Sequence, residues 1–408
     1  MSTINTEWYN YNKKLFNYLS DNPLYKKAED VISKHPSLAI INNTDLLNDT
    51  IKQAEIFSHG KEIFMIFGTG GSNLGSRSLI NLKKSKNKFF FYDNVDPNSF
   101  DIENILLSND IKKIGFIIIS KSGTTAETLS QFSCLIEICE QKNILDIMFK
   151  NTLIITEDNQ SPLRKIAMKN NCTILNHEKD IGGRYSIFSN VGLLPALINN
   201  FDAKKFFLGA NNILSSVSNE IYLEHKKLSN VFYNHSQTNF INSVLMTYSD
   251  SLFFFGKWYL QLWSESIGKN SKGITPIHSI GTTDQHSQLQ LYLDGPKDKF
   301  FTFITTNKKN QGIMMNKKVL YDNDLNYLSG KKMGDLMEAE QKATIETFKK
   351  NNFLFRVINL PEINEFTVGQ LMCSSIVEAI TTCTLFKVNP FDQPAVEQGK
   401  ILTKQYLS

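Results

Sequence analysis

Between residues 45 and 200, short apolar runs alternate with longer stretches in which apolar side chains recur at helical spacing. The helical spacing is clearest over residues 125–141, and Ser161-Pro162 is typical of the start of another helix. Strands that are apolar throughout belong to parallel sheets with helices on both faces. The pattern therefore predicts a layered α/β domain. Its predicted strands cover residues 63–67, 89–92, 114–119 and 153–155.

The rest of the chain divides into three further parts. The N-terminal segment is polar and amphipathic, which predicts a helical arm. A polar segment at 199–205 indicates a domain boundary, and beyond it a helical stretch at 241–263 and an apolar strand at 299–305 predict a second α/β domain. Pro394 could open a C-terminal helix. The predicted division is 1–44 for the arm, 45–200 and 201–392 for the two domains, and 393–408 for the last helix.

Composition and charge narrow the class of protein. The chain has 408 residues and a formal net charge of +4, from 44 basic and 40 acidic residues. This nearly equal number of basic and acidic residues does not indicate a protein that binds nucleic acid or a membrane surface. The five cysteines form no C-x-x-C pair, so neither a disulfide framework nor a zinc site is indicated. Cys134 and Cys139 fall in an apolar helical pattern and are expected in the core.

The N-terminus has no basic start followed by an apolar stretch. No apolar run approaches the roughly 18 residues that suggest a membrane span. We therefore expect a soluble, cytoplasmic protein without a membrane segment.

A glycine-rich turn, residues 68–75 (GTGGSNLG), directly follows the first predicted strand. Glycines let the backbone approach a ligand closely, and the start of a following helix favours an anion. The turn lacks the G-x-G-x-x-G spacing of dinucleotide-binding proteins. Taken alone, it indicates a ligand site and a plain tight turn about equally.

A second loop, residues 120–125 (SKSGTT), follows the strand at 114–119. Its hydroxyl groups and one ammonium group can supply the donors and the positive charge that a phosphate needs. Thr124 and Glu127 also have the spacing of a capping box, which favours a helix N-terminus at the same place. Phosphate binding is therefore the better interpretation than a solvated loop.

Two further motifs could supply the chemistry of a reaction. Arg184 follows two glycines in GGRYS and could stabilise an oxyanion, although a surface arginine after a loop is the commoner case. Glu265 opens ESIGK after an aromatic run, where apolar neighbours could make it a general base. An exposed glutamate at a helix end is again the commoner case.

Two more candidates lie later in the chain. His286 lies in a polar loop, GTTDQHS, and is suited to proton transfer near neutral pH. The other histidines are more typical of structural or exposed positions, with His278 the nearest competitor. Glu397 and Lys400 lie three residues apart on one face of the predicted last helix, and that spacing alone indicates only a surface ion pair.

Taken together and in this order, the motifs resemble those of the phosphoglucose isomerase family. The resemblance covers about residues 63–400 and rests on the Gly-Gly-Ser turn, SKSGTT, GGRYS, ESIGK, GTTDQHS and FDQPAVEQGK. GGRYS and the spacing from ESIGK to GTTDQH are its specific part, because SKSGTT also occurs in domains that only bind phosphosugars. The resemblance implies two sugar-isomerase (SIS) domains, each with three α/β/α layers and a parallel sheet. It also implies a homodimer with active sites at the subunit interface.

The resemblance further implies the reversible conversion of glucose 6-phosphate to fructose 6-phosphate through a cis-enediolate, in glycolysis and gluconeogenesis. This reaction needs no metal and no redox cofactor. Glu265 would move the proton between C2 and C1, and Arg184 would stabilise the enediolate. His286 of the partner subunit and Lys400 would assist ring opening and closing. The remaining implied contacts are Ser120, Lys121, Ser122 and Thr125 to the phosphate, and Gly71, Ser72 and Gln393 to the sugar.

Alternatives remain open at this point. The same residues could serve an isomerase that also accepts mannose 6-phosphate, and the residues at Asp284 and Pro394-Ala395 differ from some branches of the family. A regulator that only binds phosphosugars would keep SKSGTT without needing the other groups. We find no basic helix-turn-helix segment for DNA binding. A nicotinamide dehydrogenase is disfavoured by the glycine spacing.

Overall fold

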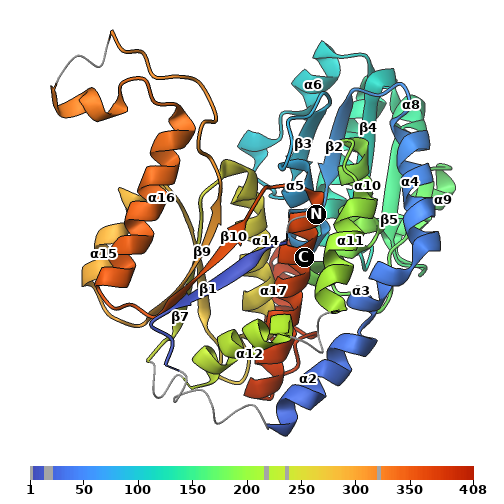
Figure 1. Ribbon diagram of the computed structural model, residues 1–408. Coiled ribbons are helices and arrows are strands. Elements are labelled where there is room, and N and C mark those ends of the chain that lie inside the picture. Colours follow the sequence, from blue (N-terminus) through green and yellow to red (C-terminus); the bar gives the residue numbers. More distant parts are fainter. Residues whose placement is uncertain (1–2, 13–21, 216–219, 235–238, 319–322) are drawn as a thin grey trace.

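The computed structural model describes residues 3–12, 22–215, 220–234, 239–318 and 323–408. Two five-stranded sheets lie on either side of a central group of helices (Figure 1). The strands are β1 (Asn5–Tyr9), β2 (Ile63–Phe67), β3 (Lys88–Tyr92), β4 (Ile114–Ile119), β5 (Thr152–Thr156), β6 (Thr173–Asn176), β7 (Asn242–Thr247), β8 (Thr275–Ile280), β9 (Lys299–Thr306) and β10 (Phe355–Leu360).

The helices fall mainly between the strands in sequence. Those of the first half are α2 (Pro23–Lys34), α3 (Pro36–Ala39), α4 (Thr44–Ser58), α5 (Leu74–Ile80), α6 (Ile102–Ser108), α7 (Ala126–Gln141), α8 (Leu145–Lys150), α9 (Pro162–Lys169) and α10 (Asn190–Ile198). Those of the second half are α11 (Ala203–Leu214), α12 (Glu220–Tyr233), α14 (Phe253–Ile267), α15 (Leu289–Asp294), α16 (Met333–Lys350), α17 (Glu365–Phe386) and α18 (Glu397–Leu407).

The first sheet is parallel throughout, in the order β3-β2-β4-β5-β6. Alternate side chains of each strand enter two different cores. Ile63 and Met65 of β2 pack with α6 to α9, whereas Phe64 and Ile66 pack with α4, α10 and the central helices. Burial on both faces is the reason that these strands are apolar throughout, and the predicted parallel sheet is confirmed.

The second sheet has the order β1-β10-β9-β7-β8, so β7 to β10 repeat the arrangement of β2 to β5. The helix expected over 241–263 is therefore wrong in its first part, because Asn242–Thr247 form β7 and α14 begins only at Phe253. A short apolar stretch does not by itself distinguish a buried strand from a buried helix. The strand expected at 299–305 is confirmed as β9.

The N-terminal segment is not entirely the helical arm that its polarity suggests. Residues Asn5–Tyr9 form β1, which pairs antiparallel with β10 at the edge of the second sheet. The available edge of β10 decides this conformation, because its unpaired backbone groups need partners that a local pattern does not reveal. Helical structure begins at Pro23. The domain boundaries near residues 44, 200 and 392 stay predictions.

Helix α17 lies at the centre of the protein, between the two sheets (Figure 1). Its crossing with α11 is close: a Cβ on Gly209 would lie 1.9 Å from the carbonyl oxygen of Phe366, and one on Gly369 would lie 2.1 Å from that of Phe206. Among the described residues, α17 is the helix long and apolar enough to be a candidate membrane span, with a mean hydropathy of 1.3. Because 94% of that stretch is buried inside the protein, α17 is a core helix.

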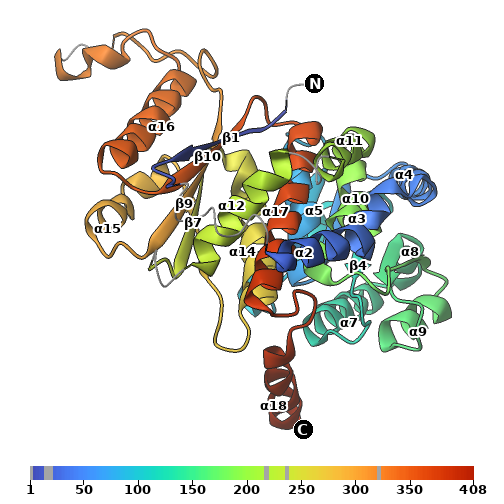
Figure 2. The same cartoon turned by 60° about the horizontal axis from the view of Figure 1, so that its bottom comes forward.

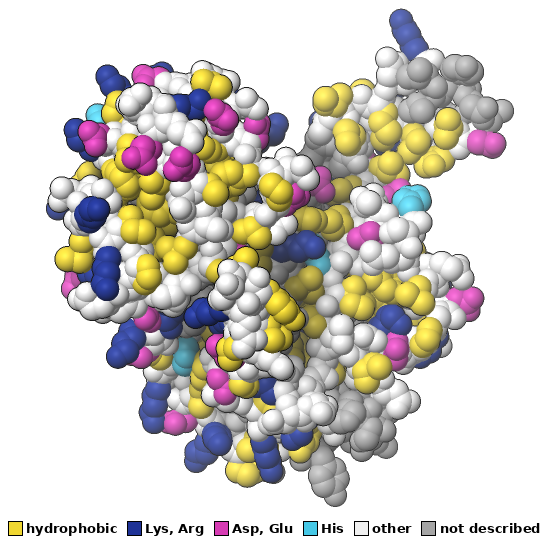
Figure 3. Space-filling model, turned by 180° about the vertical axis from the view of Figure 1, so that it is seen from behind, with side chains coloured by type: hydrophobic (Ala, Val, Ile, Leu, Met, Phe, Trp, Pro, Cys, Tyr) yellow, Lys and Arg dark blue, Asp and Glu magenta, His cyan; other side chains and the backbone are white. Residues whose placement is uncertain are grey.

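Two parts extend from the compact body. One is the projecting segment, which we define as residues 307–318 and 323–333, up to the first residue of α16 (Figure 1). Apolar side chains lie exposed along it, as Figure 3 shows from behind. The other is α18, which leaves the body at the C-terminus (Figure 2) and is exposed along its whole length. The exposed large apolar residues of these parts are Ile313, Met314, Leu325, Tyr327, Met333, Ile401, Leu402, Tyr406 and Leu407.

The two cysteines expected in the core both lie on helix α7, but on different faces of it. Cys139 is buried, but Cys134 is exposed, so the expectation for Cys134 is wrong. The buried face of α7 contains Phe132, Leu135 and Cys139, which follow each other at helical spacing of three and four residues. Cys134 lies off that face.

Candidate active site

The glycine-rich turn and the SKSGTT loop emerge side by side at the carboxyl edge of the first sheet. They follow β2 and β4, which are paired neighbours with Phe67 opposite Ile118. The chain leaves β2 toward β3 on one side, whereas β4 lies on the other side. Such a reversal of strand order leaves a crevice at the carboxyl ends, where open α/β sheets bind their ligands. The predicted phosphate loop therefore lies where the fold favours a ligand.

Within the SKSGTT loop, hydroxyl groups contact one another around a tight turn. The hydroxyls of Ser120 and Thr125 are 2.8 Å apart, and the N–H of Gly123 donates to the carbonyl of Ser120 at 3.2 Å. Gly123 has a φ of +65°, and a Cβ there would lie 2.1 Å from the hydroxyl oxygen of Ser161. Ser161 caps α9 as predicted, by accepting from Arg164. Glycine is thus required for the loop to close over α9.

The capping box expected for Thr124 and Glu127 is absent. The N-cap of α7 is Thr125, without a side-chain hydrogen bond, and the Thr124 hydroxyl donates to Ser122 at 2.9 Å instead. The first N–H groups of α7 thus have no side-chain cap and face the same loop. Lys121 lies 3.6 Å from Glu157, and its side chain is 34% exposed. The loop therefore combines hydroxyls, a cation and a helix N-terminus.

The GGS turn packs directly against the GGR turn. A Cβ on Gly71 would lie 2.2 Å from the carbonyl carbon of Gly183, so neither backbone can approach the other unless position 71 is glycine. The Ser186 hydroxyl donates to the carbonyl of Gly183 at 2.7 Å. Ser72 lies half-buried at the end of the GGS turn, which forms the 3₁₀ turn Gly70–Ser72. This contact brings Arg184 close to the glycine-rich turn at the carboxyl edge of the first sheet.

Arg184 is the centre of the site. Its side chain is 3% exposed, and its Nη1 donates to Glu265 at 3.0 Å and to Gln393 at 3.2 Å. Its Nε donates to the hydroxyl of Ser266 at 2.9 Å. Residues from three distant parts of the chain thus meet at one guanidinium group. A buried guanidinium paired with a carboxylate is held by charge-assisted bonds of fixed geometry.

The other terminal nitrogen of Arg184 reaches the segment that precedes the last helix. Its Nη2 donates to the carbonyls of Pro390 at 2.5 Å and Asp392 at 3.1 Å. The carbonyl of Arg184 itself accepts from the indole of Trp258 at 3.2 Å. Each N–H direction of the guanidinium is therefore used, which fixes its orientation.

Glu265 lies in the last turn of α14, and its side chain is 30% exposed. One carboxylate oxygen faces Arg184, and the other accepts from Gln261 Nε2 at 2.8 Å. Gln261 was not among the predicted site residues, although its position one helical turn before Glu265 places both on the same face of α14. The Oε1 of Gln261 is buried without a partner among the described residues. Gly70 adjoins Gln261, since a Cβ there would lie 3.0 Å from Nε2.

His286 and Lys400 do not join this cluster within the single chain. Among the described residues, no hydrogen bond or ion pair links either of them to Arg184 or Glu265. His286 is exposed after the 3₁₀ turn Thr283–Gln285. Lys400 lies on the protruding α18, where it pairs with Glu397 at 2.7 Å. The structure thus brings together Gly71, Arg184, Glu265 and Gln393.

His278, the competing histidine, makes contacts that are typical of a residue with a structural role. It contacts the hydroxyl of Thr247 at 3.1 Å, and a Cβ on Gly256 would lie 2.2 Å from its ring. Burial lowers the pKa of His278 to about 4, so it is neutral near pH 7.

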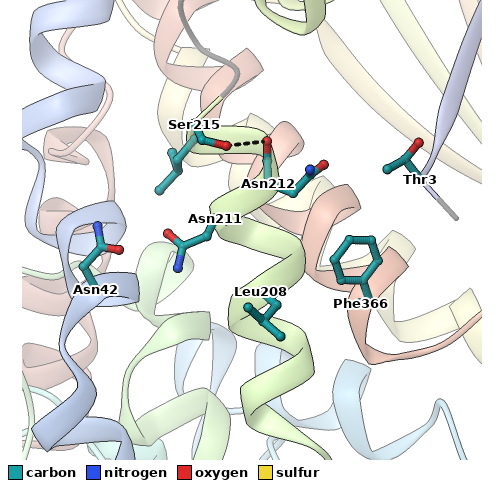
Figure 4. A pocket seen from close by; sticks show the side chains of 8 residues that line it. Thr3, Asn42, Leu208, Asn211, Asn212, Ser215 and Phe366 are labelled. Carbon is teal, nitrogen blue, oxygen red and sulfur yellow. Dashed lines mark hydrogen bonds between the residues drawn. The ribbon is translucent and has the colours of Figure 1, made fainter. Parts of the chain in front are cut away.

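A hollow of about 830 Å³ lies elsewhere, beside α11 (Figure 4). Asn42, Asn211 and Phe366 are among its lining residues, and Ser215 donates to the carbonyl of Asn212 at 3.2 Å. No charged side chain lines it among the described residues. Its size therefore does not make it a competing catalytic site.

Comparison of the sequence with known proteins identifies one family. A family model described as phosphoglucose isomerase matches residues 21–408. A probable glucose-6-phosphate isomerase of Methanococcus maripaludis is 36% identical over 379 residues, which are 89% of this chain and 83% of that protein. The structure of a hypothetical protein from Thermus thermophilus is similar with a TM-score of 0.88 and 26% identity, and the match covers 99% of this chain and 100% of that one. A glucose-6-phosphate isomerase from Chlamydia trachomatis shares the fold with a TM-score of 0.81 at 18% identity, over 99% and 88% of the two chains.

Proposed function

Because the chain belongs to the phosphoglucose isomerase family and interconverts glucose 6-phosphate and fructose 6-phosphate, we propose that Glu265 and Arg184 carry out this reaction. The enzyme thereby takes part in glycolysis and gluconeogenesis. The observation that supports the residue assignment best is the contact at 3.0 Å between Arg184 Nη1 and the carboxylate of Glu265, at the crevice beside the glycine-rich turn. A carboxylate that could act as a base and a fixed cation thus lie side by side.

In this proposal, Glu265 removes the proton from C2 and returns it to C1. Arg184 stabilises the negative charge that develops on the cis-enediolate, since a preorganised donor in a buried position acts strongly on such a charge. The hydrogen bonds from Arg184 and Gln261 hold the carboxylate in place as the acceptor of the proton. Gln393 would supply hydrogen-bonding groups for sugar hydroxyls.

The phosphate would bind at the SKSGTT loop, held by Ser120, Lys121, Ser122 and Thr125, with Gly71 and Ser72 between it and the reacting carbons. The start of α7 adds N–H groups and the positive end of a helix dipole. Binding energy from this remote group orients the reacting end of the sugar, which is how a non-reacting phosphate contributes to turnover.

Replacing Lys121 with alanine is expected to raise KM about tenfold and to lower kcat much less, which corresponds to ~1.4 kcal/mol of binding free energy. The reason is that its ammonium would contact the phosphate in both the ground state and the transition state. Steady-state kinetics measures both constants. Lys142→Ala is the matched control, because Lys142 also pairs with a carboxylate, Glu103, at 2.8 Å but lies at the other end of α7. An unchanged KM in Lys121→Ala contradicts the phosphate contact.

We further propose that two chains form a homodimer in which His286 of the partner subunit completes the site. The exposure of His286 and Lys400 in the single chain supports this arrangement. So do the apolar side chains exposed on the projecting segment and on α18, because patches of this kind mark surfaces that another protein covers. We also propose a cytoplasmic location.

The reaction is tested by following glucose 6-phosphate formation from fructose 6-phosphate with purified protein in the presence of a chelator. We expect robust turnover that the chelator does not reduce. Absence of turnover together with measurable phosphosugar binding would contradict the proposal and favour a protein that only binds phosphosugars. Assaying mannose 6-phosphate in parallel decides whether the site also accepts the C2 epimer.

A further inference from the structure

Lys269 makes a set of contacts that the reaction as described does not use. Its side chain is only 9% exposed, although it lies two residues beyond the end of α14. Its Nζ donates to the carbonyls of Glu265 at 2.9 Å, Ser266 at 2.7 Å and Asn389 at 2.6 Å. The carboxylate of Asp392 lies 3.4 Å from the same nitrogen.

Three carbonyl acceptors around one nitrogen match the three N–H donors of an ammonium group. Two of these carbonyls belong to the last turn of α14, where no further helical N–H is available and where the negative end of the helix dipole lies. A cation is stabilising at this place. Burial and the nearby Arg184 lower the pKa of Lys269, so its three hydrogen bonds are made against a cost in solvation.

The third carbonyl connects this helix end to the segment 389–393. Arg184 donates to the carbonyls of Pro390 and Asp392 in that same segment, and to the side chain of Gln393. Lys269 therefore joins the helix that carries Glu265 to the segment that orients Arg184. The SKSGTT loop lies between β4 and α7, and among the described residues no hydrogen bond or ion pair links Lys269 to it.

We propose that Lys269 is a positioning residue for the isomerisation, which holds the 389–393 segment against the end of α14 and thereby fixes the placement of Arg184 relative to Glu265. The inference rests on the roles proposed above for Glu265 and Arg184. It predicts that loss of the ammonium affects the chemical step, because a small displacement between a base and an oxyanion stabiliser reduces the rate far more than it reduces binding.

The test is Lys269→Met, which keeps an unbranched side chain of similar length and removes the charge and the donors. We expect kcat to fall about 10- to 100-fold. KM is expected to change less than about threefold, because the phosphate contacts remain. The measurement is steady-state kinetics, with the melting temperature and the folded fraction determined for the same samples.

Lys272→Met is the matched control. Lys272 lies three residues further on and also donates to a backbone carbonyl, that of Phe386, at 3.0 Å. Among the described residues, no hydrogen bond or ion pair joins its side chain to the 389–393 segment. Because Lys272 is exposed and makes one such bond, we expect this variant to lose little stability and its kcat to stay within about twofold of the parent value.

The outcomes separate the inference from the proposed function. Parent-like kcat in Lys269→Met, or an equal loss of kcat in Lys272→Met, overturns the positioning role while the isomerase activity of the parent stands. Lack of activity in the parent chain contradicts the function itself. If Lys269→Met does not fold, Lys269→Arg decides, because its planar donors cannot converge on three carbonyls from one atom. We expect a folded protein with kcat lowered and KM unchanged, and a parent-like kcat overturns the inference.

Discussion

Replacing Glu265 with glutamine is expected to lower kcat by about 10²- to 10⁴-fold and to leave phosphosugar binding nearly unchanged. An amide cannot take the proton from C2, but it can still accept a hydrogen bond from Arg184. The new amide N–H₂ would face Gln261, whose free Oε1 can accept from it once its amide group turns over. The loss is therefore chemical rather than structural. Steady-state rates and calorimetric binding of fructose 6-phosphate measure the two effects.

A near-normal rate in Glu265→Gln would show that another group is the base. The same variant also tests the proposed dimer when it is mixed with His286→Ala and the subunits are allowed to exchange. If each site combines Glu265 of one chain with His286 of the partner subunit, each hybrid dimer regains one intact site. An equal mixture should then recover about a quarter of the parent activity, because half of the dimers are hybrids. No recovery would mean that both residues act from the same chain.

Arg184→Lys is expected to lower kcat by about 10²- to 10³-fold, which is the usual cost of removing a preorganised oxyanion donor. A lysine supplies one point charge, whereas Arg184 uses Nε, Nη1 and Nη2 on five different acceptors. A lysine at this position would leave buried carbonyls without donors, so the melting temperature should also fall. Kinetics and thermal unfolding measure the two effects separately.

Arg356→Lys is the control that distinguishes these effects. Arg356, on strand β10 of the second sheet, is also buried. It donates from two nitrogens to the carboxylate of Glu378 on α17. We expect Arg356→Lys to lower the melting temperature to a similar extent, while the folded enzyme keeps most of its kcat. Equal losses of kcat in both variants, measured well below their melting temperatures, would contradict a specific role for Arg184 in the reaction.

The first sheet could be predicted because its strands are buried on both faces. Burial removes polar residues from β2, β4 and β5, and this leaves apolar runs that are visible without any knowledge of the fold. β1 could not be predicted in this way, since its conformation depends on an edge of β10 more than 340 residues away. The helix predicted at the start of the 241–263 segment was wrong for a related reason. The six residues that form β7 are a mixture of apolar and polar side chains that fits a strand or a helix equally.

The candidate site was recognisable from its motifs, but its geometry was not. Arg184 and Glu265 each favoured an ordinary surface role when taken alone, and only their contact distinguishes them from such residues. Gln261 could have been noticed by its helical spacing from Glu265. The place of His286 relative to Glu265 depends on a second chain in our proposal, and no pattern within one sequence determines a contact between two copies.

The hydrogen bonds of Arg184 also bear on the order in which the protein is made. Its partner carbonyl at Pro390 lies 206 residues later in the chain. At about 5–20 residues per second, a ribosome takes roughly 10–40 s to synthesise that stretch. The first sheet can form during this interval from strands that are all close in sequence. Arg184 acquires these acceptors only after residues 390–393 have been synthesised, so the site that we propose around it cannot assemble before that segment is made.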